Sequence, residues 1–279
     1  MLIKPFNTKA NSGFTLIEMA IVLVIVGLVV SGIVLGRSVI RQSEINSAIS
    51  DEQKYAQAAL NFQQKYGALP GDFATATSYW TASTTGCTTY PTTAAVTCNG
   101  DGNGQIGITY GSSTPAEAEE VLFWQHLDLA QMIPGSYTAS SGAGTGTYAA
   151  DHVIGQNCPA SKVDGAGFGV VWIGIVASGG GTTYPASTYP TDNGNSLGHV
   201  FIFGGYSKNN FPVAPVLTTA EASGIDSKFD DGNPATGNIE TWLTTAGAGY
   251  PATCLSNSTT YASTATTGDL CSLIFLTGF

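Results

Sequence analysis

One stretch near the N-terminus constrains the rest of the chain: an apolar run from Met19 to Gly36 that carries no charged residue. Its length is about that of the hydrocarbon core of a bilayer, which predicts a membrane-spanning helix. Glu18 lies directly before the run, and Arg37 directly after it. Because a carboxylate is costly to keep in hydrocarbon, an acid at this place predicts a functional partner.

The residues before the apolar run indicate how it is processed. Residues 1–13 carry Lys4 and Lys9 and no acid. A secretory signal peptide has its small-residue cleavage site after the apolar run, whereas here Ser12 and Gly13 precede it. Cleavage after Gly13 would therefore leave the apolar helix in the mature protein.

Residues 13–18, Gly-Phe-Thr-Leu-Ile-Glu, resemble the leader junction of type IV prepilins and type II secretion pseudopilins. This resemblance implies cleavage between Gly13 and Phe14 by a membrane prepilin peptidase, followed by N-methylation of Phe14. It also implies that Glu18 pairs with the amine of Phe14 on a neighbouring subunit during filament assembly.

The apolar helix is expected to continue beyond the membrane. From Ile45 to Tyr66 apolar residues recur at three- and four-residue steps, which is typical of an amphipathic helix. We therefore expect one spine helix from Phe14 to Tyr66, with a membrane half over 14–36 and an amphipathic half over 37–66. Residues 67–279 then form a globular head.

A turn follows the spine. Residues 69–72, Leu-Pro-Gly-Asp, contain the Pro-Gly pair of a turn, and they resemble a recurring feature of one group of large bacterial pilin-like proteins. Asp72 is expected to cap the next segment, and Trp80 to anchor it in the core.

The head pattern predicts both helices and strands. Helices are predicted over 115–133, after the capping box of Thr114 and Glu117, and from Thr218 to about Phe229, and strands over 168–176, 199–203, 238–243 and 271–276. The first two strands are apolar on both faces, which favours central strands packed against helices. Together with the resemblance, this predicts an α+β protein with the pilin fold: a long N-terminal spine helix packed on a mainly antiparallel β-sheet head, with extra short helices.

The cysteines, Cys87, Cys98, Cys158, Cys254 and Cys271, all lie beyond the membrane segment. On an oxidising side of a membrane they are expected to form disulfides. Pairs of Cys87 with Cys98 and of Cys254 with Cys271 are favoured because each closes a short Gly/Ser/Thr-rich loop, although other pairings stay open. The second pair would resemble the C-terminal disulfide loop of many pilins, and Cys158 would be a buried thiol.

Two acidic segments are candidate calcium loops. Asn99, Asp101 and Asn103 alternate as in the first half of an EF-hand loop, but Tyr110 stands where the bidentate acid belongs, so Glu117, Glu119 or Glu120 would have to supply that charge. The second segment carries Asp226, Asp230 and Asp231 before Gly232. The alternatives are a polar Gly-rich turn for the first segment and a helix end with an Asx-turn for the second.

Charge and motif content restrict the function further. Residues 1–66 carry +2 and residues 67–279 carry −12 of the formal net charge of −10. An acidic head argues against nucleic acid as a direct ligand. His126, His152 and His199 are scattered and no catalytic motif is present, so the sequence predicts no enzyme. Trp124 is interpreted as a packing residue, His126 as a surface residue and His199 as structural.

These observations favour a pilin-like subunit that polymerises into a type IV pilus or a secretion pseudopilus. The size of the head favours a minor or specialised subunit. The expected partners are other pilin subunits, the prepilin peptidase and methylase, and an inner-membrane assembly platform. Before assembly the subunit is expected in the inner membrane of a Gram-negative-type bacterium, with its head in the periplasm. The alternative is a single-pass membrane-anchored binding protein or surface enzyme that does not polymerise.

Overall fold

The computed structural model describes residues 14–82, 96–107, 119–139, 152–174, 197–207, 210–241, 254–257, 259–262, 268 and 270–279. The predicted leader 1–13, including Gly13, and Cys87 lie outside the described residues. The chain divides into two compact units, Met1–Glu44 and Ile45–Phe279, and each is described by itself.

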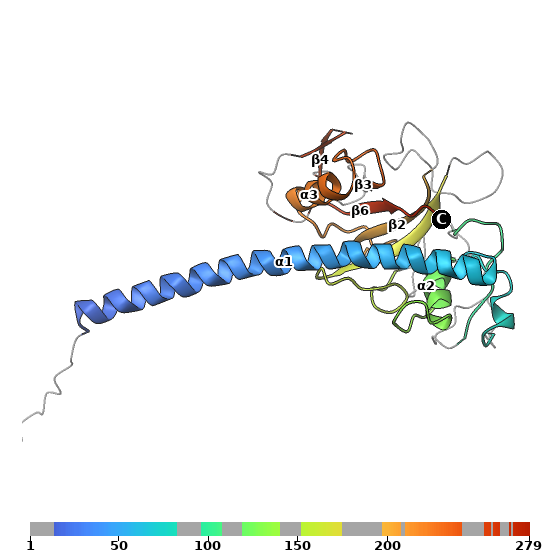
Figure 1. Ribbon diagram of the computed structural model, residues 1–279, viewed down its shortest axis with the longest axis horizontal. Coiled ribbons are helices and arrows are strands. Elements are labelled where there is room, and N and C mark those ends of the chain that lie inside the picture. Colours follow the sequence, from blue (N-terminus) through green and yellow to red (C-terminus); the bar gives the residue numbers. More distant parts are fainter. Residues whose placement is uncertain are drawn as a thin grey trace, which may run out of the picture. The chain divides into compact units, whose positions relative to one another are not determined.

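Helix α1 spans Leu16–Tyr66, so it begins two residues later than predicted and ends at the predicted residue (Figure 1). Its end is set by Gly67, whose φ of 71° is left-handed and whose N–H donates to the carbonyl of Gln63 at 2.8 Å. Within the second unit α1 buries one face, made of Ile45, Ala48, Ile49, Ala58, Ala59 and Phe62. The predicted amphipathic half is thereby confirmed.

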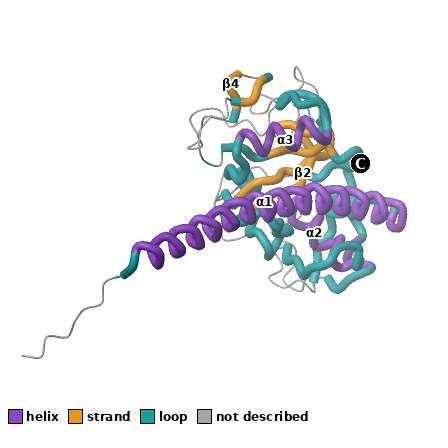
Figure 2. Tube along the Cα trace, turned by 60° about the vertical axis from the view of Figure 1, so that its left-hand side comes forward, coloured by secondary structure: helices purple, strands orange, loops and turns teal. Residues whose placement is uncertain are grey.

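The head contains a four-stranded sheet. Its strands are β1 Ala166–Ile173, β2 Gly198–Gly205, β3 Ile239–Thr241 and β6 Leu273–Leu276, in the order β1-β2-β6-β3 (Figure 2). All three pairings are antiparallel. With α1, the short helices α2 Glu119–Leu129 and α3 Thr219–Phe229, and a small β4–β5 ladder (Leu255–Asn257 and Thr260–Tyr261), this confirms the predicted α+β architecture and is consistent with the pilin fold.

The strand register places large side chains side by side on one face of the sheet. Phe168 pairs with Phe203 and Val170 with Phe201, and this face belongs to the main core. Tyr55 of α1 contacts the ring of Phe168 edge-on, with centroids 5.3 Å apart, and contacts Trp124 of α2 in the same way at 5.2 Å. Aromatic packing between α1, α2 and the sheet thus holds the head on the amphipathic half of the spine.

The opposite face of the sheet corrects one prediction. Val171, Val200 and Ile202 lie there in a second apolar cluster, which is closed by Phe211 and Val213 after β2 and not by a helix. In addition, β1 lies at one end of the strand order, so it is not a central strand of the described sheet. An irregular segment can cover an apolar face as well as a helix can, which is why two-sided apolarity does not predict a helix there.

The other predicted elements fit with shifted ends. Helix α2 ends at Leu129, four residues before the predicted Ile133, because the chain turns at Gln131, whose φ of 58° is left-handed. Its predicted capping box at Thr114 lies outside the described residues. The capping box of α3 is confirmed: Thr218 and Glu221 exchange hydrogen bonds of 2.8 and 3.2 Å.

One of the two favoured disulfides is directly described. Cys254 and Cys271 are bonded across a sequence separation of 17. Cys98 is also disulfide-bonded, and its favoured partner Cys87 lies outside the described residues. Cys158 is a buried thiol, as expected.

Candidate functional site

Glu18 lies at the start of α1, where its carboxylate is held by Thr15. The backbone N–H and the hydroxyl of Thr15 both donate to Glu18 Oε2, at 2.7 and 2.8 Å, and the Glu18 N–H donates back to the hydroxyl at 3.3 Å. This is the reciprocal arrangement of a capping box, in which two otherwise unpaired donors of the first helical turn are satisfied. In a single chain Glu18 therefore already has a local role.

The first unit presents an apolar surface. Beyond Glu18 the large apolar side chains of α1 are exposed as far as Ile40, with Leu23 at 71% and Leu35 at 69% exposure. Among the described residues, α1 is the one helix that is long and apolar enough to cross a membrane. Such an exposed apolar face requires lipid or other protein around it.

A first carboxylate cluster lies in the head. Ligand oxygens of Asp72, Asp101 and Glu119 lie within 4.8 Å of one another. Asp72 comes from the Leu-Pro-Gly-Asp turn, Asp101 from the loop after it and Glu119 from the start of α2. The sequence had indicated Asp101 and named Glu119 as one source of the missing charge, so the structure brings these two together.

Backbone N–H groups of residues 101–107 fix this cluster. Asp72 accepts from the N–H groups of Asn103 and Gly104, both at 2.9 Å, and Glu119 accepts from those of Asp101 and Gly107, at 2.9 and 2.8 Å. The predicted capping role of Asp72 is therefore wrong: the short helix η1 Ala76–Ser78 has Thr75 at its N-cap and no side-chain cap. The carboxylate instead holds a loop that follows about thirty residues later.

Close backbone packing explains the glycines around the cluster. A Cβ at Gly100 would lie 2.2 Å from the carbonyl oxygen of Gly71, and one at Gly71 would lie 2.5 Å from that of Glu119. Only residues without a side chain allow the turn, the loop and α2 to approach so closely.

Electrostatics in the cluster favour protonation or a cation. Burial raises the pKa of Glu119 to about 8, and the charges of Asp101 and Asp72 act in the same direction. Burial also raises the pKa of Asp72 to about 6. Three carboxylates offer oxygen ligands of the kind that Ca²⁺ takes in proteins.

The two asparagines of the predicted loop are placed differently. The Asn103 side chain lies beside Asp101, with its amide donating to Asp101 Oδ2 at 2.7 Å. Asn99 instead accepts from the backbone and hydroxyl of Thr77, at 2.9 and 3.1 Å. Asn99 is therefore not part of the carboxylate cluster, and Asp72 joins Asp101 and Glu119 in its place. Local spacing does not reveal this, because Asp72 is distant from the loop in sequence.

Asp226, Asp230 and Asp231 form a second cluster, also within 4.8 Å. Here each carboxylate holds the chain after α3: Asp226 accepts from the Gly232 N–H at 2.9 Å and from the Tyr261 hydroxyl at 2.8 Å. Asp231 accepts from the Asn233 N–H at 2.8 Å, and Asp230 from the N–H groups at the start of β3. These are the contacts of the helix-end and Asx-turn alternative.

Two histidines of the described head, His126 and His199, make structural contacts. The expectation that His126 is a surface residue is wrong: it is fully buried, its Nδ1 accepts from the Gly71 N–H at 2.9 Å, and burial lowers its pKa to about 4. His199 accepts from the Ile106 N–H at 3.2 Å through Nε2 and lies 2.9 Å from the Phe279 carbonyl through Nδ1. Trp124 is fully buried in the core, as predicted.

Glu52 on the buried side of α1 gives a pH prediction. It has no hydrogen bond or ion pair within the described part of the chain, and burial raises its pKa to about 7. The folded state therefore binds the proton more tightly than the unfolded state. The stability that the folded state gains from protonated Glu52 is fully present below about pH 4.5. It is lost as the pH rises through the folded-state pKa of about 7.

We expect Glu52→Gln to raise the unfolding free energy at pH 8 by about 1 to 2 kcal/mol and to leave it unchanged at pH 4. Denaturant unfolding of the full chain in detergent at both pH values measures this. Glu44→Gln is the matched control, because its contact with Arg41 is long, at 3.8 Å, and partly exposed. An equal gain at both pH values would contradict the assignment.

Two features occur together in this chain: an α+β head and an exposed apolar helix with a capped start. A family model, the prokaryotic N-terminal methylation motif, matches residues 8–34. Neither a curated protein nor a solved structure matches the chain.

The matched motif is the prepilin-type cleavage and methylation motif of type IV pilin-like proteins. This match supports a type IV pilin-like precursor. The motif implies processing by a prepilin peptidase and assembly with other pilin subunits. Together with the apolar helix, it fits a membrane-anchored precursor that later becomes part of a pilus.

Proposed function

We propose that the mature chain is a structural subunit, and not an enzyme, that polymerises through α1 into a type IV pilus or a secretion pseudopilus. The observation that carries this proposal is the methylation motif at residues 8–34, which includes the start of an exposed apolar helix with one acid in its first turn. In the filament, Glu18 pairs with the methylated amine of Phe14 on a neighbouring subunit. Apolar packing of the membrane halves supplies most of the binding energy.

The same features support a proposal for its cellular setting. The subunit is held in the inner membrane of a Gram-negative-type bacterium with its head in the periplasm, where an oxidising environment supports the Cys254–Cys271 disulfide. An inner-membrane platform then moves it into the filament. The size of the head, residues 67–279, favours a minor or specialised subunit.

One observation favours the alternative of an anchored, non-polymerising protein. The capping box gives Glu18 a partner within its own chain, at Thr15. Glu18 therefore does not require a second subunit to be satisfied, and a membrane-anchored binding protein or surface enzyme could use the same cap.

Fractionation of the wild-type chain distinguishes the two functions. Expressed in full with a prepilin peptidase and an assembly platform, the processed chain is expected in the filament fraction sheared from the cells. Electron microscopy with an antibody to the head then locates it along filaments. If all of the processed chain stays in the membrane fraction, the polymerising function is wrong.

We further propose that Asp72, Asp101 and Glu119 hold a structural Ca²⁺. Binding would neutralise three acids that lie within 4.8 Å of one another. At a Ca²⁺ concentration about 100-fold above the dissociation constant, we expect stabilisation of about 2.7 kcal/mol relative to a chelator.

Thermal unfolding of the full chain in detergent tests this prediction. The Ca²⁺ effect should be large at pH 8 and small at pH 5, because protons compete for the raised-pKa carboxylates Glu119 and Asp72. Asp101→Asn should abolish it, whereas Asp231→Asn in the other cluster should leave it intact. Identical unfolding with Ca²⁺ and with chelator would contradict the proposal.

A further inference from the structure

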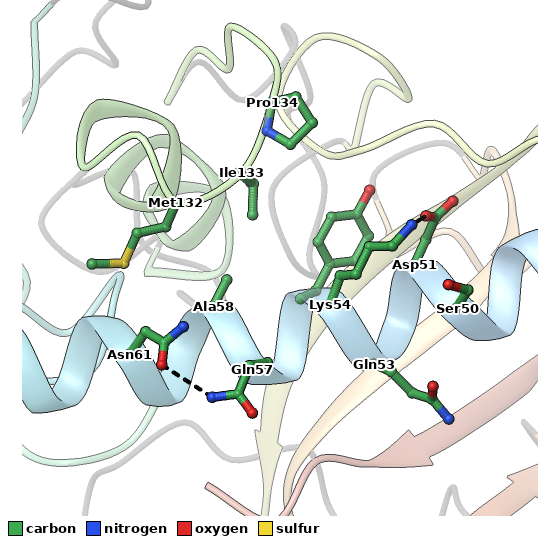
Figure 3. A pocket seen from close by; sticks show the side chains of 11 residues that line it. Ser50, Asp51, Gln53, Lys54, Gln57, Ala58, Asn61, Met132, Ile133 and Pro134 are labelled. Carbon is green, nitrogen blue, oxygen red and sulfur yellow. Dashed lines mark hydrogen bonds and ion pairs between the residues drawn. The ribbon is translucent and has the colours of Figure 1, made fainter.

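A groove of about 500 Å³ runs along the head half of α1 (Figure 3). One wall is the exposed side of α1, with Lys54, Gln57 and Asn61, and the other is the segment 132–134 after α2. Figure 3 shows Met132, Ile133 and Pro134 on the side opposite the polar side chains of the helix.

The two walls have different chemistry. Met132 is half-buried and Pro134 exposed, so the wall after α2 offers apolar surface. On α1, Gln57 and Asn61 bond to each other at 3.0 Å, and Lys54 reaches Asp51 at 2.8 Å while its side chain stays 67% exposed. The groove therefore has an apolar wall and a polar wall, and on the polar wall Lys54, paired with Asp51, is the exposed cation.

Lys54 is one of few positively charged residues in an acidic unit. Residues 45–279 contain five Lys or Arg and seventeen Asp or Glu. Two such heads repel each other over most of their surfaces, and this repulsion is relieved where an acid of one meets a cation of the other. An exposed lysine beside an apolar wall is such a place.

The end of α3 carries a complementary segment. Phe229 is 43% exposed and is followed directly by Asp230 and by the exposed Asp231. Of the exposed large aromatic residues described in the head, Tyr79, Tyr206 and Phe229, only Phe229 is followed directly by acids. The Lys228 ammonium lies over this ring, 4.8 Å from its centroid, so the segment combines an exposed ring with one cation and two carboxylates and stays negative overall.

The segment and the groove lie on different parts of the same unit. In both views, α3 and α2 lie on opposite sides of the head half of α1 (Figures 1 and 2). A surface that binds a different surface of an identical copy makes a heterologous contact, and such a contact repeats into an open helical filament when it does not close into a ring.

We propose that residues 229–231 of one subunit dock into the groove of a neighbouring copy in the filament. Phe229 packs against the wall 132–134, and Asp231 lies toward Lys54. The inference rests on the proposed function, because it needs a second copy held beside the first. It adds a specific contact between heads to the packing of the N-terminal helices.

Cysteine cross-linking in filaments of the full chain tests this docking. Phe229→Cys combined with Gln57→Cys places one thiol on the docking segment and one in the groove, both at exposed positions. Mild oxidation of sheared filaments is expected to give a ladder of covalent dimers, trimers and longer multimers that reduction returns to monomers. The matched control is Phe229→Cys with Ala74→Cys, since Ala74 is exposed but outside the groove.

The outcomes separate the docking from the polymerisation. A ladder that requires both Phe229→Cys and Gln57→Cys supports the docking. Filaments in which this pair gives no more multimers than the control pair, or only an intrachain disulfide, overturn the docking while leaving the proposed function intact. A wild-type chain that forms no filaments overturns the proposed function and, with it, this inference.

Discussion

Replacement of Glu18 by alanine is expected to abolish incorporation of the chain into filaments while leaving the head folded. The head belongs to a separate compact unit, Ile45–Phe279, so a change at the start of α1 does not reach its core. In the filament the loss leaves the Phe14 amine of a neighbouring subunit without its carboxylate partner in an apolar surrounding, where an unpaired charge is costly. The amount of processed chain in the sheared fraction measures the effect.

Two matched variants separate pairing from capping. Thr15→Ala removes the hydroxyl that bonds Glu18 but keeps the carboxylate, so it should still assemble at a cost of about 1 kcal/mol in helix stability. Glu18→Gln can still accept the Thr15 hydrogen bonds but has no charge, so it should fail like Glu18→Ala. Normal assembly of Glu18→Gln would show that Glu18 acts through the cap alone.

Removal of the Cys254–Cys271 disulfide is expected to lower the unfolding free energy of the head by about 3 kcal/mol, since closing a loop with a sequence separation of 17 restricts the unfolded chain. The backbone of Cys271 also exchanges hydrogen bonds of 3.0 and 3.1 Å with that of Leu217, so the bridged loop is attached to the segment before α3. Denaturant unfolding of a Cys254→Ala, Cys271→Ala variant of the full chain in detergent measures the loss.

Cys158→Ala is the control for this measurement, because Cys158 is also buried but is not part of the bridge. We expect it to cost at most about 1 kcal/mol, on the scale of one buried methylene-sized group. If the double variant loses no more than this control, the disulfide does not stabilise the head in the way that loop closure predicts.

The spine helix and the pairing of Cys254 with Cys271 could be predicted from the sequence because their signals are local. Periodic apolar residues and a glycine after Tyr66 define the helix, and a short polar loop favours the disulfide. The capping box of Thr15 and Glu18 has an equally local signal, Thr-x-x-Glu before an apolar run.

The candidate sites of the head could be predicted only in part because their contacts are distant in sequence. Asp72 reaches Asn103 across 31 residues, and His126 reaches Gly71 across 55. Neither separation leaves a periodic signal. Similarly, nothing in the two-sided apolar strands indicates that Phe211 and Val213, and not a helix, close the second face of the sheet.

The mature N-terminus tests the central claim most directly. Intact-mass and peptide mass spectrometry of the wild-type chain, isolated from cells that express it in full, should show a protein that begins at Phe14 and carries one methyl group on its amine. A chain that retains residues 1–13, or that is cut elsewhere, would contradict the account of a processed, polymerising pilin-like subunit.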